Sequence, residues 1–252
     1  MSTVSQIYDA INELAPFSLT MSFDNTGILV GDRTRTIKKA LLALDCTMDV
    51  LEEAKKIGAE LIITHHPIIF HPMKRINEDS VVYHLIRNDI AVISAHTNLD
   101  IAEGGVNDAL SEAIGLKNCA GLEALENGYL GRVGRLSETF TAKKFAVKVK
   151  EALHASSIKF ADAGNPIQKI ALCSGSGGDC IEAACACKAD ALLTADVKHN
   201  QFIDAVAAGI SIFDAGHFDT EDVVIEPLKE YLHQKINDVE FVTTHISSIA
   251  AI

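Results

Sequence analysis

Two adjacent histidines, His65 and His66, are the first candidates for chemistry in this chain of 252 residues. They stand in LIITHHPIIF, between an apolar run and Pro67. Neighbouring side chains of a regular strand point to opposite faces, so the pair either lies where the chain leaves the strand or serves two targets. Pro67 cannot donate a ladder hydrogen bond and favours an extended or turn conformation at His66. We therefore expect the pair at a strand end; without a ligand, one ring would be exposed and the other buried.

Other apolar runs also end in polar clusters, namely AHTNLD, TADVKHN and DAGHFDTE. The carboxyl ends of parallel strands gather at one edge of an open sheet, so these clusters are expected to converge. Imidazole and carboxylate together suit zinc, iron, manganese or a similar divalent ion. The set exceeds one tetrahedral site and matches two neighbouring ions with a bridging carboxylate. The candidate donors are His65, His66, His96, Asp100, His217 and Glu221.

Two of these clusters share a His-x-x-x-acid spacing, His96 to Asp100 and His217 to Glu221. On a helix this spacing puts both groups on one face, so a helix that starts after each strand would hold both donors rigidly. Taken singly, either histidine is equally well interpreted as a hydrogen-bonded residue at a strand end.

Two glycine-containing stretches are weaker candidates. In SFDNTGILVGD, Asp24 and Asn25 precede Gly27, which is turn chemistry ahead of a strand. The loop is interpreted first as structural and second as the rim of the metal cleft. GSGG, at residues 175–178, follows a predicted strand and would present backbone N–H groups to an anion if it is not a plain turn.

The elements around these residues alternate between short apolar strands and amphipathic helices, which indicates βαβ units. KKALLALDCTMDVLEEAKKIGAELIITHHP lines up with QKIALCSGSGGDCIEAACACKADALLTADVK, so the chain is predicted to contain two similar halves. The predicted fold is α/β, with two similar α/β domains, mainly parallel sheets and a metal cleft at the strand carboxyl ends. Glycines cluster near residue 126, which places the domains at 1–125 and 126–252, with the last strand able to pack back on the first half.

Composition excludes several classes of protein. The formal net charge of -12 argues against a nucleic-acid footprint and against anionic membrane surfaces. No apolar run approaches the roughly 20 residues of a membrane span, and the N-terminus lacks the pattern of a signal peptide. Four of the six cysteines lie between residues 173 and 187, without a CxxC pair, and are interpreted as small buried thiols. A cytoplasmic location fits this cysteine usage.

The ordered motifs of the chain resemble the GTP cyclohydrolase I type 2 homologue family, which includes YbgI-like and NGG1-interacting-factor-like proteins. The resemblance runs from about residue 14 to about residue 230, and its specific part is the double histidine together with GHFDTE. The motifs that carry it are SFDNTGILVGD, ITHHPIIF, SAHTNLDIAEGGVNDALSEAIGL, LGRVGRL, GSGG, LLTADVKHNQFIDA and DAGHFDTE.

The resemblance implies two similar α/β domains, two divalent metal ions per chain and a ring-shaped hexamer. By motif position it implies that Glu221 is the bridging carboxylate and that His96 lies beside the metals, so that Glu221 and His96 are the catalytic candidates. The metal ligands it implies are His65, His66, Asp100, His217 and Glu221. The C-terminal VEFVTTHISSIAAI departs from the family pattern, and its His245 is either an extra ligand or an exposed residue.

Two functions follow from these expectations. The first is a dinuclear metal-dependent hydrolase, by resemblance GTP cyclohydrolase-like, acting on a nucleotide or another phosphate-containing small molecule. The second is a non-catalytic protein for metal binding, metal homeostasis or regulation. Bound metal with no turnover of any substrate would favour the second.

Overall fold

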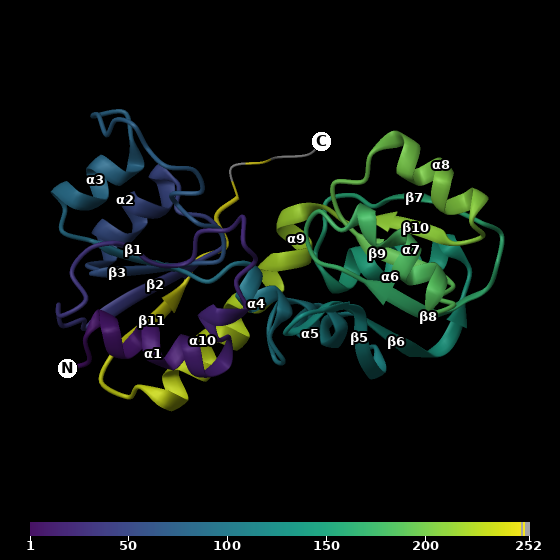
Figure 1. The fold of residues 1–252 in the computed structure, drawn as a ribbon, viewed down its shortest axis with the longest axis horizontal. Coiled ribbons are helices and arrows are strands. Elements are labelled where there is room, and N and C mark those ends of the chain that lie inside the picture. Colours follow the sequence, from purple (N-terminus) through teal and green to yellow (C-terminus); the bar gives the residue numbers. More distant parts are fainter. Residues whose placement is uncertain (248, 250–252) are drawn as a thin grey trace. The chain divides into compact units, whose positions relative to one another are not determined.

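The computed structural model describes residues 1–247 and 249. The chain divides into two compact units, each with its own sheet (Figure 1). Unit 1 comprises Met1–Glu103 and the described residues from Ile225 onward, and unit 2 comprises Gly104–Val224. The sequence predicts a domain boundary after residue 125. That position lies inside unit 2, in the turn between two paired strands.

Unit 1 is assembled from both ends of the described chain. Its elements, in chain order, are α1 (Val4–Leu14), η1 (Phe17–Leu19), β1 (Gly27–Val30), β2 (Lys39–Ala43), α2 (Met48–Ile57), β3 (Leu61–Thr64), α3 (Val81–Arg87), β4 (Ala91–Ser94), α4 (Thr97–Ile101), α10 (Ile225–Lys235) and β11 (Glu240–Thr243). The last strand, β11, pairs in parallel with β2, so the chain returns to its first sheet after completing unit 2.

The sheet of unit 1 has the order β1-β4-β3-β2-β11. Within the described residues its pairings are parallel, except that β1 runs antiparallel to β4 at the edge. Every residue of β3 and β4 is buried, because helices cover both faces of the sheet. Figure 1 shows α2 and α3 on one face and α1 and α10 on the other. This burial explains why the strands read as continuous apolar runs.

Helix α2 illustrates how local sequence fixes an element of unit 1. The side chain of Thr47 caps the helix by accepting the N–H of Val50. Gly58 ends it in the left-handed conformation, at φ 73°. Leu51 and Ala54, on the same face as Val50, pack into the core against the sheet. The predicted helix MDVLEEAKKIGA therefore forms between the two strands that the sequence places around it.

Unit 2 contains a longer sheet. Its elements are α5 (Val106–Ala113), β5 (Lys117–Leu125), β6 (Gly128–Phe140), α6 (Ala142–Ala152), β7 (Lys159–Ala161), β8 (Ile167–Leu172), η2 (Gly178–Cys180), α7 (Ile181–Ala186), β9 (Ala191–Thr194), α8 (His199–Ala207), β10 (Ser211–Asp214), α9 (His217–Glu221) and η3 (Asp222–Val224). The strand order is β5-β6-β8-β9-β10-β7. The core residues of α5 and α6 pack on one face of this sheet, and those of α7 and α8 on the other.

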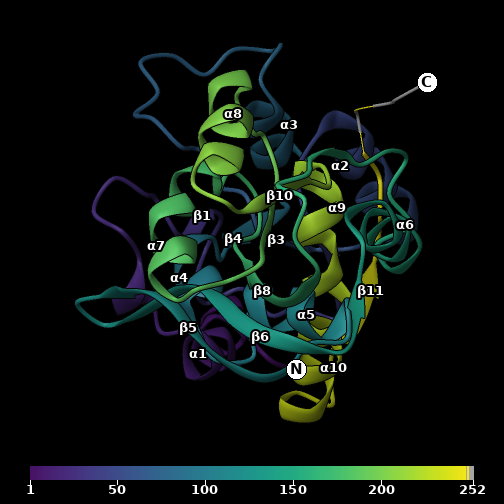
Figure 2. The same cartoon turned by 90° about the vertical axis from the view of Figure 1, so that its right-hand side faces the viewer.

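The mainly parallel sheet predicted from the sequence is found in unit 1 but not in unit 2. Among the described residues of unit 2, β8-β9 and β9-β10 are parallel, whereas β5-β6, β6-β8 and β10-β7 are antiparallel. The cause is the hairpin of β5 and β6, whose long strands are visible in Figure 2. Its turn contains Glu126 and Asn127, followed by Gly128 at φ 146°. The glycine cluster that suggested a domain boundary is therefore a hairpin turn.

The two units repeat one pattern of strands. In unit 1 the parallel strands β2, β3 and β4 are flanked by antiparallel β1, and in unit 2 β8, β9 and β10 are flanked by antiparallel β7. The registers pair Thr64 with Ser94 and Thr194 with Asp214. Ser94 therefore corresponds to Asp214, and His217 corresponds to Thr97 rather than to His96. The two His-x-x-x-acid motifs thus differ by one position in the repeat.

The cysteines are all reduced in this structure, and Cys46, Cys173 and Cys180 are buried. Cys185 and Cys187 are half-buried and pack against the core of unit 2, as expected for small thiols near a sheet. Within the described residues, no helix is both long enough and apolar enough to cross a membrane.

Alkylation of the native protein at pH 8 is expected to modify the exposed Cys119 well before the buried Cys46. Burial, with a contribution from the charge of Asp45, raises the pKa of the Cys46 thiol to about 12. Only the thiolate is nucleophilic, so Cys46 reacts slowly until the pH nears that value or the chain unfolds. Peptide mapping after iodoacetamide, with and without urea, measures the order; early modification of Cys46 in the folded protein would contradict it.

Candidate metal centre

The double histidine lies where the sequence predicts it, directly after β3. The N–H of His65 donates to the carbonyl of Ala43 at 3.4 Å, and that of His66 to Leu44 at 3.0 Å. The two rings nevertheless lie close together, with centroids 5.1 Å apart. The hydroxyl of Thr64 donates to the carbonyl of His66 at 2.8 Å, which marks a turn. The chain has thus left the regular pleat, and adjacent side chains can reach one region.

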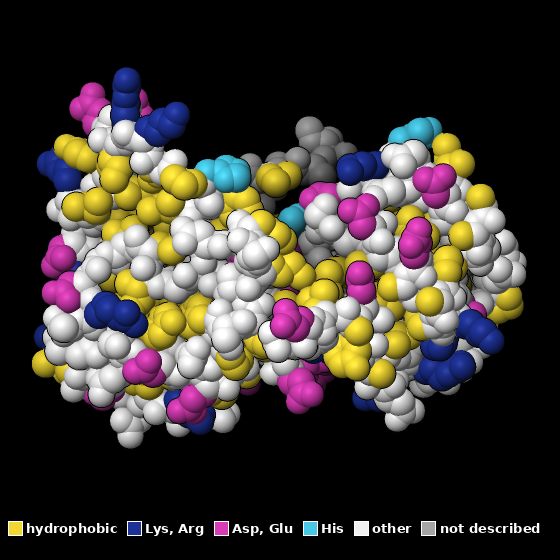
Figure 3. Space-filling model, in the orientation of Figure 1, with side chains coloured by type: hydrophobic (Ala, Val, Ile, Leu, Met, Phe, Trp, Pro, Cys, Tyr) yellow, Lys and Arg dark blue, Asp and Glu magenta, His cyan; other side chains and the backbone are white. Residues whose placement is uncertain are grey.

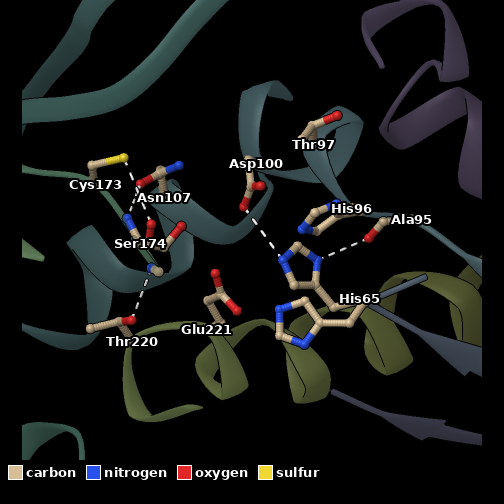
Figure 4. A network of polar contacts seen from close by, with 12 residues as sticks. His65, Ala95, His96, Thr97, Asp100, Asn107, Cys173, Ser174, Thr220 and Glu221 are labelled. Atoms are coloured by element: carbon tan, nitrogen blue, oxygen red, sulfur yellow. Dashed lines mark hydrogen bonds and ion pairs between the residues drawn. The ribbon is translucent and has the colours of Figure 1, made fainter. Parts of the chain in front are cut away.

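An acceptor at Nδ1 orients each of these rings. Nδ1 of His65 lies 2.9 Å from the carbonyl oxygen of Ala95 (Figure 4), and Nδ1 of His66 lies 2.8 Å from Oδ1 of Asp45. A carbonyl oxygen only accepts, so the proton of the neutral His65 ring is on Nδ1 and its lone pair is on Nε2. Metal-binding histidines commonly have such an acceptor behind them, which fixes both tautomer and orientation.

His96 is held in the same way by a buried carboxylate from a distant loop. Its Nδ1 lies 3.0 Å from Oδ1 of Asp24, and Asp24 also accepts the N–H of Thr97 at 3.1 Å and its hydroxyl at 2.6 Å. Burial alone would raise the pKa of Asp24, but the hydrogen bonds from His96 and Thr97 lower it to about 2. The carboxyl is therefore ionised and accepts a hydrogen bond from Nδ1–H of His96. The loop of Asp24 contributes directly to the site.

Together the three imidazoles of unit 1 form one donor group. The ring centroid of His96 lies 5.1 Å from that of His65 and 5.5 Å from that of His66. One ring nitrogen of each histidine lies within 4.8 Å of the others, a spacing that one or two ions could bridge. Asp100, on α4, adds a carboxylate whose Oδ1 is 3.6 Å from Nε2 of His65 (Figure 4). The resemblance places His96 beside the metals, and in this structure its ring belongs to the same donor group as His65 and His66.

Unit 2 carries a second, smaller donor group on the short helix α9. Nε2 of His217 lies 3.1 Å from Oε2 of Glu221, one helical turn further on. Nδ1 of His217 lies 2.7 Å from Oδ2 of Asp196, which follows β9. His217 therefore has the same carboxylate support as His66 and His96. The predicted i, i+4 pairing of His217 and Glu221 is present.

The glycine-rich loop after β8 supports this second group. The N–H of Gly175 donates to the hydroxyl of Thr220 at 3.0 Å, and that of Gly177 to the hydroxyl of Thr194 at 2.8 Å. The N–H of Ser174 donates to Oδ1 of Asn107 at 2.9 Å (Figure 4). These amides are engaged within the protein, which favours a structural turn over the anion site considered from the sequence.

Gly175→Ala is expected to lower the free energy of unfolding by roughly 1 kcal/mol more than Gly209→Ala, the matched control. Both glycines are left-handed, at φ +58° and +81°, where a side chain costs roughly 1–2 kcal/mol. At Gly209 nothing lies within 4 Å of the added Cβ. At Gly175 the added Cβ would collide with Oε1 of Glu221 and lie 3.2 Å from Nε2 of His217. Urea denaturation of both variants measures the difference; equal losses would contradict it.

Several hydrogen-bond partners in and beside these donor groups were not predicted from the sequence, chiefly Asp45, Asp196 and Thr220. Asp45 and Asp196 each stand just after an apolar strand, the kind of position that predicts the histidine donors from the sequence. His245 lies 3.7 Å from Glu226 on α10, and its side chain is half exposed. That contact is with a carboxylate outside the histidine group.

Comparison with known proteins identifies the family. The model of Duf34/NIF3 (NGG1p interacting factor 3) matches residues 2–250. The chain belongs to the Duf34/NIF3 family. The resemblance drawn from the sequence motifs is thereby confirmed. A GTP cyclohydrolase 1 type 2 homolog from Clostridium perfringens is 37% identical over 96% of this chain and 95% of its own length. A second homolog with the same name, from Methanocaldococcus jannaschii, is 36% identical over 94% of this chain and 97% of its own length.

Several solved structures share the fold of this chain. The Staphylococcus aureus protein SA1388 superimposes with a TM-score of 0.93, at 27% identity over 99% of both chains. Reduced HcgD from Methanocaldococcus jannaschii superimposes with a TM-score of 0.83, at 33% identity over 96% of this chain and 97% of its own. The protein ybgI, at 24% identity and a TM-score of 0.87, supports the fold alone.

The donor chemistry of both groups fits divalent metal ions. Unit 1 offers three imidazoles and the carboxylate of Asp100, and unit 2 offers one imidazole and the carboxylate of Glu221. Neutral imidazole with carboxylate, and no thiolate, suits zinc, iron or manganese. The acceptors behind the rings hold the histidines in the tautomer that a metal requires.

Proposed function

We propose that this Duf34/NIF3 protein is a divalent-metal-dependent hydrolase that acts on a nucleotide or another phosphate-containing small molecule. Its two ions would be held by His65, His66 and Asp100 from unit 1 and by His217 and Glu221 from unit 2. The observation that carries the proposal is the histidine group of unit 1, in which an acceptor fixes each Nδ1 and the ring nitrogens lie within 4.8 Å of one another. The names of the curated relatives point to the same reaction class.

Each residue of the candidate site would have a distinct role in this reaction. The acceptors Ala95, Asp45 and Asp24 hold the three imidazoles of unit 1 in fixed orientations, so binding requires little rearrangement. When bound, a pair of divalent ions would lower the pKa of water toward neutrality and would polarise the bond under attack. Glu221 would supply negative charge to balance the cations, and His96 would add a further imidazole beside the metals.

Metal analysis together with a substrate screen tests this proposal. The purified full-length protein is loaded with zinc, manganese or iron, its bound metal is counted, and GTP and a panel of phosphoesters are then offered. We expect two metal equivalents per chain and turnover that a chelator removes. Stoichiometric metal without turnover of any substrate would instead support the non-catalytic metal-binding function. Failure to bind metal at all would exclude both.

A further inference from the structure

Two exposed aromatic side chains of unit 1 come from separate loops. Phe23 is in the turn before β1 and is 62% exposed, and Phe70 is in the segment after β3 and is 39% exposed. Their ring centroids are 6.5 Å apart, with the planes tilted by 54°. Hydrophobic side chains also gather around α3 and the loop before it on the face of unit 1 seen in Figure 3. A single exposed phenylalanine needs no explanation, but two that adjoin each other from different loops do.

Hydrogen bonds hold the two loops together. Nδ2 of Asn25, two residues after Phe23, donates to the carbonyl of Ile69, the residue before Phe70, at 2.6 Å. The N–H of Met21 donates to the hydroxyl of Thr97 at 3.0 Å, and the N–H of Asp24 donates to the carbonyl of Met21 at 3.0 Å. The rings are therefore presented to solvent by an anchored backbone. A fixed, exposed aromatic pair is suited to binding because little further ordering is required.

The aromatic pair adjoins the histidine group. The ring of Phe70 lies 6.4 Å from that of His96, at an interplanar angle of 80°. Asp24, the residue after Phe23, is the carboxylate that holds His96. One loop therefore supplies both an exposed ring and the support of a candidate metal ligand. A ligand that contacted both phenylalanines would have its nearest polar neighbours among the imidazoles.

We propose that Phe23 and Phe70 form a stacking platform for the planar heteroaromatic ring of a ligand, such as a nucleobase, whose polar end reaches the histidine group. Ligand pockets combine aromatic surface with a few convergent polar groups, and this arrangement supplies both. Aromatic side chains bind bases through their faces, with little dependence on the identity of the base. The inference rests on the proposed function, since the platform serves the same site. It favours ring-bearing substrates over phosphoesters that lack a ring.

The absence of tryptophan from the sequence allows a direct test. Phe23→Trp places a lone tryptophan on the platform and keeps an aromatic face there. The zinc-loaded full-length variant, excited at long wavelength to avoid absorption by the nucleotide, is titrated with GMP and separately with ribose 5-phosphate. We expect saturable quenching by GMP and none by ribose 5-phosphate. Equal responses to both, or none to GMP, would overturn the proposal.

A second substitution in the same background tests the pair. Phe70→Leu keeps the residue apolar but removes the second ring, and we expect it to weaken GMP binding at least 10-fold. The matched control is Phe160→Leu in unit 2, because Phe160 is 40% exposed, nearly the same as Phe70. Unchanged affinity in Phe70→Leu would overturn the platform. So would tryptophan emission that shifts with protein concentration alone, which would show that a second copy of the chain covers this surface.

The titration also separates this inference from the hydrolase proposal. It is repeated after chelation, because stacking itself requires no metal and the ring should still be recognised. If ringless phosphoesters are hydrolysed and the tryptophan does not sense GMP, the platform fails and the hydrolase stands. If GMP quenches in a ring-dependent manner and no substrate is turned over, the platform stands and the hydrolase fails.

Discussion

Glu221→Gln is expected to abolish metal-dependent turnover while the chain stays folded. The two side chains have nearly the same shape, but the amide carries no charge to offset bound cations. Loss of an outer-shell partner typically costs roughly 10–100-fold in metal affinity or activity, and loss of a ligand should cost more. The contact with His217, at 3.1 Å, is the one most directly affected. Initial rates with the best substrate of the screen and the bound-metal count are the two measurements.

Glu182→Gln is the matched control for this prediction. It makes the same chemical change on another helix of unit 2, α7, where the side chain is exposed. Its turnover and metal content should equal those of the unsubstituted protein. Glu221→Gln with unchanged turnover would refute the assignment of Glu221, and far-ultraviolet circular dichroism of both variants would exclude unfolding as the cause of a loss.

His65→Asn is expected to weaken metal binding by at least roughly 100-fold, with little change in the stability of the metal-free protein. The amide nitrogen of asparagine can occupy the position of Nδ1 and keep the hydrogen bond to the carbonyl of Ala95. Nothing then replaces Nε2, the nitrogen that carries the lone pair. The substitution therefore separates the structural contact of His65 from its role as a donor.

Competition against a chelating metal indicator measures this loss of affinity. His233→Asn serves as the control, since His233 is an exposed histidine on α10 of the same unit. His65→Asn that binds metal as tightly as His233→Asn would show that His65 is a buried, hydrogen-bonded histidine and not a ligand. A large fall in the melting temperature of metal-free His65→Asn would show that its contact with Ala95 had not been preserved.

The strands and helices that depend on local sequence patterns were predictable from the sequence. Apolar strands β3 and β9, each ending in threonine, and the helices after them follow from hydrophobic periodicity and capping, as at Thr47 and Gly58. The edges of the sheets were not predictable in this way. The glycine cluster at β5-β6 indicates a turn equally well within a domain or between domains. Which strand joins which edge depends on pairing between segments far apart in sequence.

Part of the candidate site was likewise predictable from the sequence, and part of it was not. Strand-end position was enough to find His65, His66 and His217, because the carboxyl ends of parallel strands share an edge. It was not enough to assign their supports. Asp24 and His96 are 72 residues apart, and only the folded loop brings them to 3.0 Å. The need for glycine at Gly175 likewise depends on where α9 places Glu221, which local sequence does not encode.

We propose above that the imidazoles and carboxylates of the candidate metal centre hold a pair of divalent ions. Anomalous difference maps from a crystal of the metal-loaded protein, collected on both sides of the absorption edge of the metal, test this claim most directly. We predict two peaks per chain, with Nε2 of His65 and a carboxylate oxygen of Glu221 among the atoms at bonding distance. A map without peaks, or with ions bound by residues of one unit only, would contradict it.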